Sequence, residues 1–290
     1  MKKHFIRFWE PLLAVVFWGN SFIATKVALR ELNPQTIILL RLLLGSAFLI
    51  LIAVYSRKDF SLSLKNHGAI FILAIIAVFH LWIQITGLKF TSAVNTGWIV
   101  GMSPVFIAIL SVIVFKEKFF KTKIVGITIA FSGLVLLVSR GDFSSVGFIS
   151  HKGDLLVLAS AFTWSVYSMV NKKITINYSP TMTILFLFLM MAVIIAPFTI
   201  SVNAFSSVMH LSFQGWMSIL FLGIFCSGIA YVLWARSLKK LEASETGVFL
   251  YFEPFVTVLS AWFILDEKIT LMIILSGLII TIGVILVNRN

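Results

Sequence analysis

Ten apolar stretches, each close to the length that crosses a lipid bilayer, follow one another along this chain of 290 residues. A hydrocarbon core about 30 Å thick needs roughly 20 apolar residues in helical form. Valine, isoleucine, leucine and phenylalanine run together in these stretches and do not alternate with polar residues, which favours helices over barrel strands. The pattern predicts an all-α integral membrane protein. The expected spans are 10–28, 36–55, 68–87, 92–115, 122–138, 154–171, 180–201, 213–235, 243–264 and 269–287.

The composition excludes several other classes of protein. Hydrophobic residues make up 60% of the chain and charged residues 12%, too little charge to cover a soluble surface of this size. Cys226 is the only cysteine, so an intrachain disulfide scaffold is excluded. No phosphate-binding GxxxxGK[ST] loop, HExxH or GxSxG motif occurs, so we expect neither ATP hydrolysis nor an enzyme, and neither a cofactor nor a metal.

Loop charge predicts the orientation of the chain in the membrane. The net charge of +12 would suggest nucleic-acid binding in a soluble protein, but here the basic residues lie between apolar stretches. With the N-terminus in the cytoplasm, 16 Lys and Arg residues fall inside and 5 outside. We therefore expect both termini in the cytoplasm. The first span is expected to be an anchor and not a cleaved signal peptide, because no small-residue cleavage pattern follows it. The composition, rich in lysine, isoleucine and phenylalanine, indicates a bacterial inner membrane as the location.

The chain also contains an internal repeat. Shifting it by 150 residues matches 12 residues between 88 and 140 without a gap, among them Pro104 with Pro254. A shift of 146 matches Trp18 with Trp164 at the start of each half. The sequence thus predicts two repeats of five spans each, residues 1–145 and 146–290. Because five is odd, the second repeat enters the membrane inverted, as in many secondary transporters, although duplication also builds channels and scaffolds.

With this organisation the sequence resembles the drug/metabolite transporter superfamily, in its EamA-type branch. The resemblance covers the whole chain and implies a secondary carrier of small metabolites, often amino acids or related solutes moving outward. It also implies that spans five and ten act as a buttress while the other spans rock. The matching motifs are Trp18-Gly19, Arg41-Leu42-Leu43, Pro104-Val105-Phe106 followed by Glu117, and Glu253-Pro254-Phe255 followed by Glu267.

Glu253 is the most unusual residue within the spans. It lies about ten residues into the ninth span, roughly 15 Å along a helix and thus near the bilayer centre. A carboxyl group there loses the hydration that stabilises its charge, so it is a candidate for proton coupling or cation recognition. The alternative is a structural carboxyl at a helix break. Pro104 and Pro254 each remove a backbone donor and are candidates for kinks that gate, or for static kinks.

Spans one and six carry matching polar and aromatic stripes. Trp18, Ser21 and Phe22 share one helix face, and their repeat mates are Trp164, Tyr167 and Ser168. We interpret both stripes as the lining of one central cavity, the alternative being helix packing with tryptophans at the interface. The full expected substrate-binding set is Trp18, Ser21, Phe22, His80, Gln84, Asn95, Trp98, Trp164, Tyr167, Ser168, Tyr231, Trp234, Tyr251 and Glu253.

Three other charged residues are interpreted as structural. Arg41 is expected to reach the outer interface or to pair with a carboxylate such as Glu31. Glu117 and Glu267 are expected to be caps at span ends.

The sequence favours a secondary active transporter that exports a small metabolite, an amino acid or related amphipathic solute, by alternating access with proton exchange. Its expected partners are the small-molecule substrate and membrane lipids, with no nucleic acid and no obligate protein partner. The alternatives are an uncoupled facilitator or channel, which counterflow would distinguish, and a membrane-embedded lipid-modifying enzyme, for which no convergent acid, base or metal residues are found.

Overall fold

The computed structural model describes residues 2–57, 64–115, 121–139, 152–174, 176, 178–200, 202–240 and 249–288. Within these ranges every regular element is a helix and no strand occurs. Seven of the described helices are long and apolar enough to cross a membrane. Two shorter apolar helices, Phe249–Leu265 and Leu271–Leu286, follow near the C-terminus. The expected all-α membrane architecture is therefore confirmed.

Most of the expected spans correspond to single helices. Proline begins α2 and α8, where its fixed φ suits the first helical position. The helices that correspond to one expected span each are α1 (Lys2–Ala28), α2 (Pro34–Tyr55), α3 (Leu64–Lys89), α6 (Lys121–Ser139), α7 (Lys152–Lys173), α8 (Pro180–Ile195) and α14 (Leu271–Asn288).

Three of the expected spans are interrupted. One consists of α4 (Ala93–Val100) and α5 (Ser103–Phe115), and the described part of another consists of η4 (Phe249–Phe252) and α13 (Glu253–Leu265). Pro104 and Pro254 are each the second residue of the helix that follows the break, where a missing backbone N–H is tolerated. Each proline thus starts a new helix and does not bend a continuous one. The third interrupted span runs through α10 (Phe213–Leu220), the π-helix η3 (Phe221–Ile229) and α11 (Ala230–Lys240).

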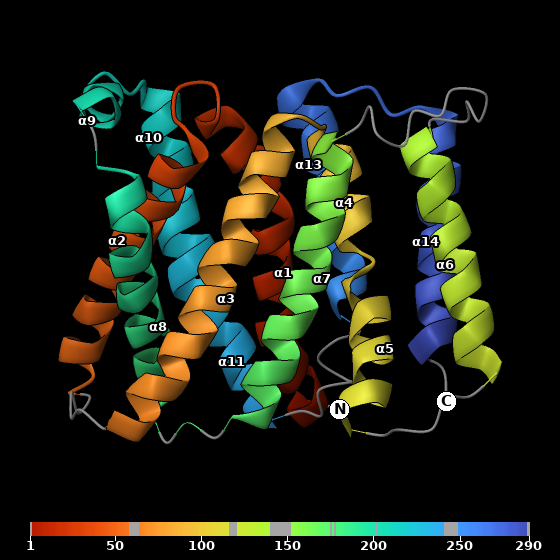
Figure 1. The fold of residues 1–290 in the computed structure, drawn as a ribbon, viewed down its shortest axis with the longest axis horizontal. Helices are drawn as coiled ribbons and strands as arrows, with labels where there is room; N and C mark the ends of the chain where they lie inside the picture. The colour runs from red at the N-terminus through yellow and green to blue at the C-terminus, as the bar shows by residue number, and fades with distance from the viewer. Residues whose placement is uncertain are drawn as a thin grey trace.

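Helices from the two halves of the chain pack side by side. In Figure 1, α6 and α14 stand together at the right, α3 runs beside α7, and α2 beside α8. The first helix, α1, packs against α11 and α13. The ribbon begins and ends at the lower edge of the view, while α9 (Val202–Met209) lies across the upper edge. The buried core therefore forms between the halves, and apolar side chains such as Val193 and Phe263 remain exposed on the outside, as lipid contact requires.

Glycine permits the close approach of α6 and α14. A Cβ atom on Gly283 would lie 2.3 Å from the backbone nitrogen of Ala130, and one on Gly133 would lie 2.8 Å from that of Ile280. Real Cβ atoms do not come so near, so only glycine fits at both positions. Small residues of this kind let membrane helices pack backbone to backbone.

Candidate functional site

An aromatic cluster occupies the centre of the bundle, where α1, α7 and α11 meet. The ring of Trp18 lies 5.9 Å from Trp164, 5.4 Å from Tyr231 and 5.2 Å from Trp234, measured between ring centroids. Trp164 in turn stacks on Tyr167 at 5.2 Å. The structure thus brings together five residues of the expected substrate-binding set, from both halves of the chain.

Hydrogen bonds to the π-helix hold Trp18 in this cluster. Its indole nitrogen donates to the carbonyl oxygen of Cys226 over 3.1 Å, and the Cys226 thiol donates to the carbonyl of Phe17 over 3.2 Å. Both contacts join α1 to η3, and both Trp18 and Cys226 are buried. The position of the indole is therefore fixed by the backbone and not by ring packing alone.

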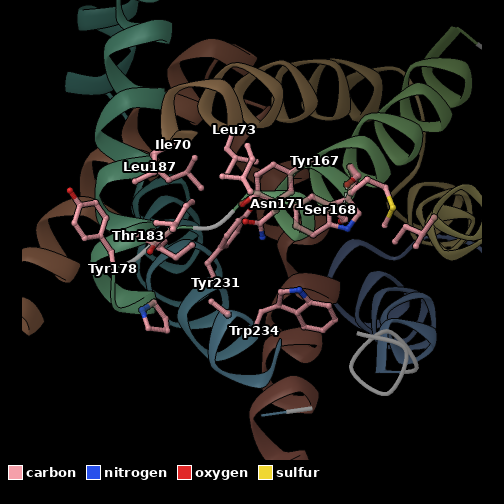
Figure 2. Close-up of a pocket in the computed structure, with 18 of the residues that line it drawn as sticks. Ile70, Leu73, Tyr167, Ser168, Asn171, Tyr178, Thr183, Leu187, Tyr231 and Trp234 are labelled. Carbon is pink, nitrogen blue, oxygen red and sulfur yellow. Dashed lines mark hydrogen bonds between the residues drawn. The ribbon is translucent and has the colours of Figure 1, made fainter. Parts of the chain in front are cut away.

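The larger of two hollows beside the cluster is a cavity of about 470 Å³. It extends from Trp164 in α7 to Tyr178, in the connection that leads into α8, and to Pro180, the first residue of α8. This connection lies at the lower edge of Figure 1. Figure 2 shows side chains of α3, α7, α8 and α11 converging on the cavity, among them Asn171 and Thr183. Apolar walls with a few polar groups are typical of sites for small amphipathic molecules.

The smaller hollow, of about 50 Å³, lies on the other side of the same aromatic residues. Trp164, Tyr231 and Leu250 line both hollows, so their side chains form the boundary between them. We call the smaller hollow the polar pocket. It is lined by Trp18, Ser21, Phe22, Arg41, His80, Leu81, Gln84, Val100, Trp164, Tyr231, Leu250 and Glu253.

Arg41 faces this polar pocket, which corrects the sequence-based expectation. We expected its side chain at the outer interface or paired with Glu31. Arg41 is instead only 5% exposed, and its Nε donates to the hydroxyl of Ser227 over 3.1 Å. The reason is that α2 packs its Arg41 face against η3, which shields the side chain from lipid and from the interface.

Glu31 lies outside the spans and has a different partner. Its carboxylate accepts hydrogen bonds from the backbone nitrogen and the hydroxyl of Ser212, at 2.8 and 2.6 Å. These hydrogen bonds lower the pKa of Glu31 below its usual value, because they stabilise the charged form.

Glu253 and His80, both of the expected set, also line the polar pocket. Glu253 is 7% exposed and is the first residue of α13. His80 has its Nδ1 2.9 Å from the carbonyl oxygen of Ser160, so Nδ1 is the donor and carries a proton. Its ring lies 5.3 Å from that of Trp164. No cluster of three or more metal-binding side chains is found in the part of the chain that the structure describes.

Three residues of the expected set lie away from both hollows. Asn95 and Trp98 belong to α4, which packs against α13, and the Trp98 ring lies 5.3 Å from that of Phe255. The Tyr251 hydroxyl donates to the carbonyl of Val284 over 3.3 Å. Conversely, the expected set omitted Asn171, although it lies on the same stripe as Trp164, and it omitted Tyr178 and Thr183, which no periodicity marks.

Polar contacts join the helix ends at the edge of the bundle opposite the cavity. The Glu267 carboxylate accepts from the backbone nitrogens of Ala93 and Val94, at 2.8 and 2.9 Å, and so caps α4. The Lys26 ammonium donates to the carbonyl of Leu88 over 2.8 Å and to that of Thr91. These helix ends lie at the upper edge of Figure 1. We call this set of contacts the upper closure. The cap by Glu267 is as expected, whereas Glu117 lies outside the described residues.

The Thr91 hydroxyl extends this closure to the second half of the chain by donating to the carboxylate of Asp154, near the start of α7.

The fold and the site together define a membrane transporter. The helical membrane bundle contains interrupted helices, a solute-sized cavity that extends from its centre to one edge, and a polar closure at the opposite edge. The chain belongs to the EamA-like transporter family, whose model matches residues 11–139 and again residues 151–289. The resemblance noted in the sequence is therefore confirmed.

Several curated proteins are similar to the chain over almost its whole length. An "Uncharacterized transporter" of Archaeoglobus fulgidus is 29% identical over 96% of both chains. The "Uncharacterized transporter YdfC" of Bacillus subtilis is 30% identical over 93% of this chain and 87% of its own. A "Probable amino-acid metabolite efflux pump" of Escherichia coli is 25% identical, covering 94% of this chain and 91% of its own.

A solved crystal structure of another protein has the same fold. It superposes with a TM-score of 0.66 at 18% identity and covers 97% of this chain and 95% of its own. At that identity the likeness establishes the arrangement of the helices alone.

Proposed function

We propose that this protein is a secondary active transporter, and not an enzyme, that exports a small amphipathic solute of the amino-acid type by alternating access. The observation that carries the proposal is the asymmetry of the bundle. A cavity of about 470 Å³ extends toward the lower edge and stops at Trp164 and Tyr231, whereas the upper edge is joined by the polar contacts of Lys26 and Glu267. This is the arrangement expected of a carrier that faces one side of the membrane.

The packing of the helices supports ten spans in two inverted repeats, residues 1–145 and 146–290. If the proposed repeats are exchanged, the contact of α3 with α7 becomes that of α11 with α1, and the contact of α4 and α5 with α7 becomes that of α13 with α1. The pairs α2–α8 and α6–α14 become themselves. A set of contacts that survives this exchange lets the two halves trade conformations, which moves the opening from one face to the other.

Orientation supports export. The Lys and Arg bias predicts both termini in the cytoplasm, and the ribbon begins and ends at the edge toward which the large cavity extends. In this orientation the large cavity would face the cytoplasm, which is the state in which an exporter in a bacterial inner membrane takes up its solute. The efflux pump of Escherichia coli, to which the chain is similar, is in keeping with that direction.

Proton exchange is assigned to Glu253. Its carboxyl lies in the polar pocket, on the far side of Trp164 and Tyr231 from the cavity. The ionisable groups around it are Arg41 from α2, His80 from α3, Cys226 from η3 and Tyr231 from α11. We propose that the carboxyl takes a proton from the outside and releases it to the cytoplasm in exchange for solute.

Transport into proteoliposomes tests this function. Wild-type protein should show counterflow of labelled amino acid, which a channel does not, and an inward proton gradient should drive solute out. Glu253→Gln should retain counterflow but lose the response to the gradient. Asp266→Asn is the matched control, because Asp266 is exposed and has φ 53°, a conformation that asparagine also adopts. Gradient-driven transport that persists in Glu253→Gln would contradict the coupling role, and the absence of any counterflow in the wild type would contradict the carrier.

A further inference from the structure

We propose that Arg41 is the anion-binding residue of the transport site and that, with Glu253, it selects solutes carrying both a carboxylate and an ammonium group. This inference rests on the proposed function and deepens it, because it names the two residues that recognise the ends of an α-amino acid. Neither the family match nor the relatives assign a role to Arg41.

The first argument is that the guanidinium of Arg41 has unused donors. A guanidinium carries five N–H donors and cannot lose its charge in a protein. The Nε of Arg41 donates to Ser227, which holds one edge of the group against η3. Among the described residues, no hydrogen bond or ion pair is found for its two terminal nitrogens, although Arg41 is only 5% exposed and lines the polar pocket.

The second argument is the cost of leaving such a group unpaired. A buried cation without a partner is strongly unfavourable, so buried charges are normally paired or hydrogen-bonded. The terminal nitrogens of arginine match the two oxygens of a carboxylate in a bidentate pair, and such pairs are common where carboxylates are recognised. A carboxylate that enters the polar pocket would supply the partner that Arg41 lacks.

Glu253 is the natural protein partner, yet it does not pair with Arg41. Both side chains line the polar pocket, and no ion pair forms between them within 4.0 Å. No hydrogen bond to the Glu253 carboxyl is found in the described part of the chain either, although the residue is only 7% exposed. A guanidinium and a carboxyl group that face one small pocket without touching leave room for a dipolar group between them. An α-amino acid has that group, with its carboxylate toward Arg41 and its ammonium toward Glu253.

The volumes of the two hollows indicate where the side chain of such a solute would lie. A hollow of about 50 Å³ holds little more than the charged head group, since one water molecule occupies roughly 30 Å³ of liquid. Trp164, Tyr231 and Leu250 border both hollows, so an apolar side chain attached to a head group in the polar pocket would lie against these residues. The site therefore fits amino acids with an apolar side chain, the aromatic rings contributing stacking and cation–π contacts.

Binding to matched ligands tests the assignment. The probes are alanine, leucine, methionine and phenylalanine, each compared with the amine that lacks its carboxylate and the acid that lacks its amine. The protein is purified at full length, and affinity is measured by titration calorimetry. Wild-type protein should bind at least one amino acid more tightly than either partial ligand. Arg41→Gln should weaken the binding of that amino acid and of its acid by about 30-fold or more and leave the binding of the amine unchanged.

Control variants keep the test decisive. Glu253→Gln should show the opposite pattern, with weaker binding of the amine and unchanged binding of the acid. Arg41→Lys keeps the charge but loses the bidentate geometry, so its affinities should lie between those of wild type and Arg41→Gln. Arg30→Gln removes an exposed arginine and should change nothing. Unchanged amine binding in Arg41→Gln also shows that the variant is folded.

The possible failures are separable. If Arg41→Gln binds amino acids as the wild type does, or if the wild type binds no carboxylate-bearing probe, the assignment of Arg41 is overturned whatever the protein transports. If Arg41-dependent binding is found but labelled amino acid does not cross the membrane in proteoliposomes, the assignment stands and the proposed transport function fails.

Discussion

The indole rings of Trp18 and Trp164 meet edge to face at the centre of the bundle, with centroids 5.9 Å apart and planes inclined by 77°. The two residues occupy equivalent positions in the two sequence repeats, one in α1 and the other in α7. A contact between equivalent positions is retained when the repeats exchange conformations. Such a ring pair contributes about 0.5–1.5 kcal/mol beyond its buried area, so it can serve as a pivot that need not break during transport.

Replacing Trp164 tests the boundary between the two hollows. Trp164→Ala removes a side chain that lines both of them and contacts Trp18 and Tyr231. We expect a loss of stability of roughly 3–5 kcal/mol and loss of amino-acid binding, whereas Trp164→Phe should retain most of both. Thermal unfolding with and without ligand measures the two effects. Trp262→Ala, at a site 52% exposed on the outside, is the control, and an equal loss of binding there would contradict the role of Trp164.

The upper closure predicts a conformational variant. Glu267→Gln keeps a hydrogen-bond acceptor at the start of α4 but removes the negative charge of the carboxylate. That charge strengthens the cap by about 0.5–1 kcal/mol and also interacts with Lys26. The equilibrium between the two conformations of the carrier should then shift several-fold toward the one that is open at the upper edge. Labelling of Ser21→Cys by an impermeant thiol reagent, in a Cys226→Ala background, should become faster from outside. Lys268→Gln, next to Glu267 but exposed, should not change the rate.

The contact between Glu31 and Ser212 predicts a pH-dependent contribution to stability. The pKa of Glu31 is lowered in the folded protein by hydrogen bonds from Ser212. The stabilisation is therefore complete above the ordinary carboxyl pKa of about 4.3 and is lost as the pH falls through the lower folded value. Glu31→Gln should melt below the wild type at pH 7 and approach it near pH 3. A difference in melting temperature that stays constant across this range would contradict the linkage.

Competition at Glu253 predicts the pH dependence of binding. If the ammonium group of the solute and a proton share this carboxyl, protonation removes the charge that the ammonium requires. The affinity for amino acids should then fall as the pH is lowered, while the affinity for the matching acids, held by Arg41, should not. Calorimetric titrations at several pH values measure both. Glu253→Gln should abolish the difference between the two ligand classes, and a pH dependence that survives in this variant would assign the effect to His80.

The packing of α6 against α14 predicts an effect at Gly283. Gly283→Ala places a Cβ atom 2.3 Å from the backbone nitrogen of Ala130, so the helices must separate at a cost of about 1–3 kcal/mol. Gly68→Ala is the matched control, because no atom lies within 4 Å of its added Cβ. That substitution should be neutral or slightly stabilising. Melting temperatures of the two variants in one detergent test the contrast, and equal values would contradict the close packing.

The sequence predicts the class of fold well, because a membrane helix must be apolar over its whole length and its hydropathy therefore marks it. The stripes through Trp18 and through Trp164 likewise predicted residues that meet in the centre, since helical periodicity fixes which residues share a face of each helix. Arg41 was misinterpreted because its partner, Ser227, lies 186 residues away in a π-helix that no local pattern reveals. Asn95 and Trp98 lie away from both hollows, which the sequence did not indicate because hydropathy does not report which polar residues of a span face a cavity.

The pairing of α6 with α14 has a consequence for how the protein is made. In the part of the chain that the structure describes, α6 has its extensive contact with α14 alone, and α14 is the last helix. During synthesis α6 therefore waits in the bilayer with its glycine-bearing face open to lipid until α14 leaves the ribosome. A chain truncated before Leu271 would keep that face exposed, and quality-control proteases could recognise the orphan helix as the mark of an unfinished molecule.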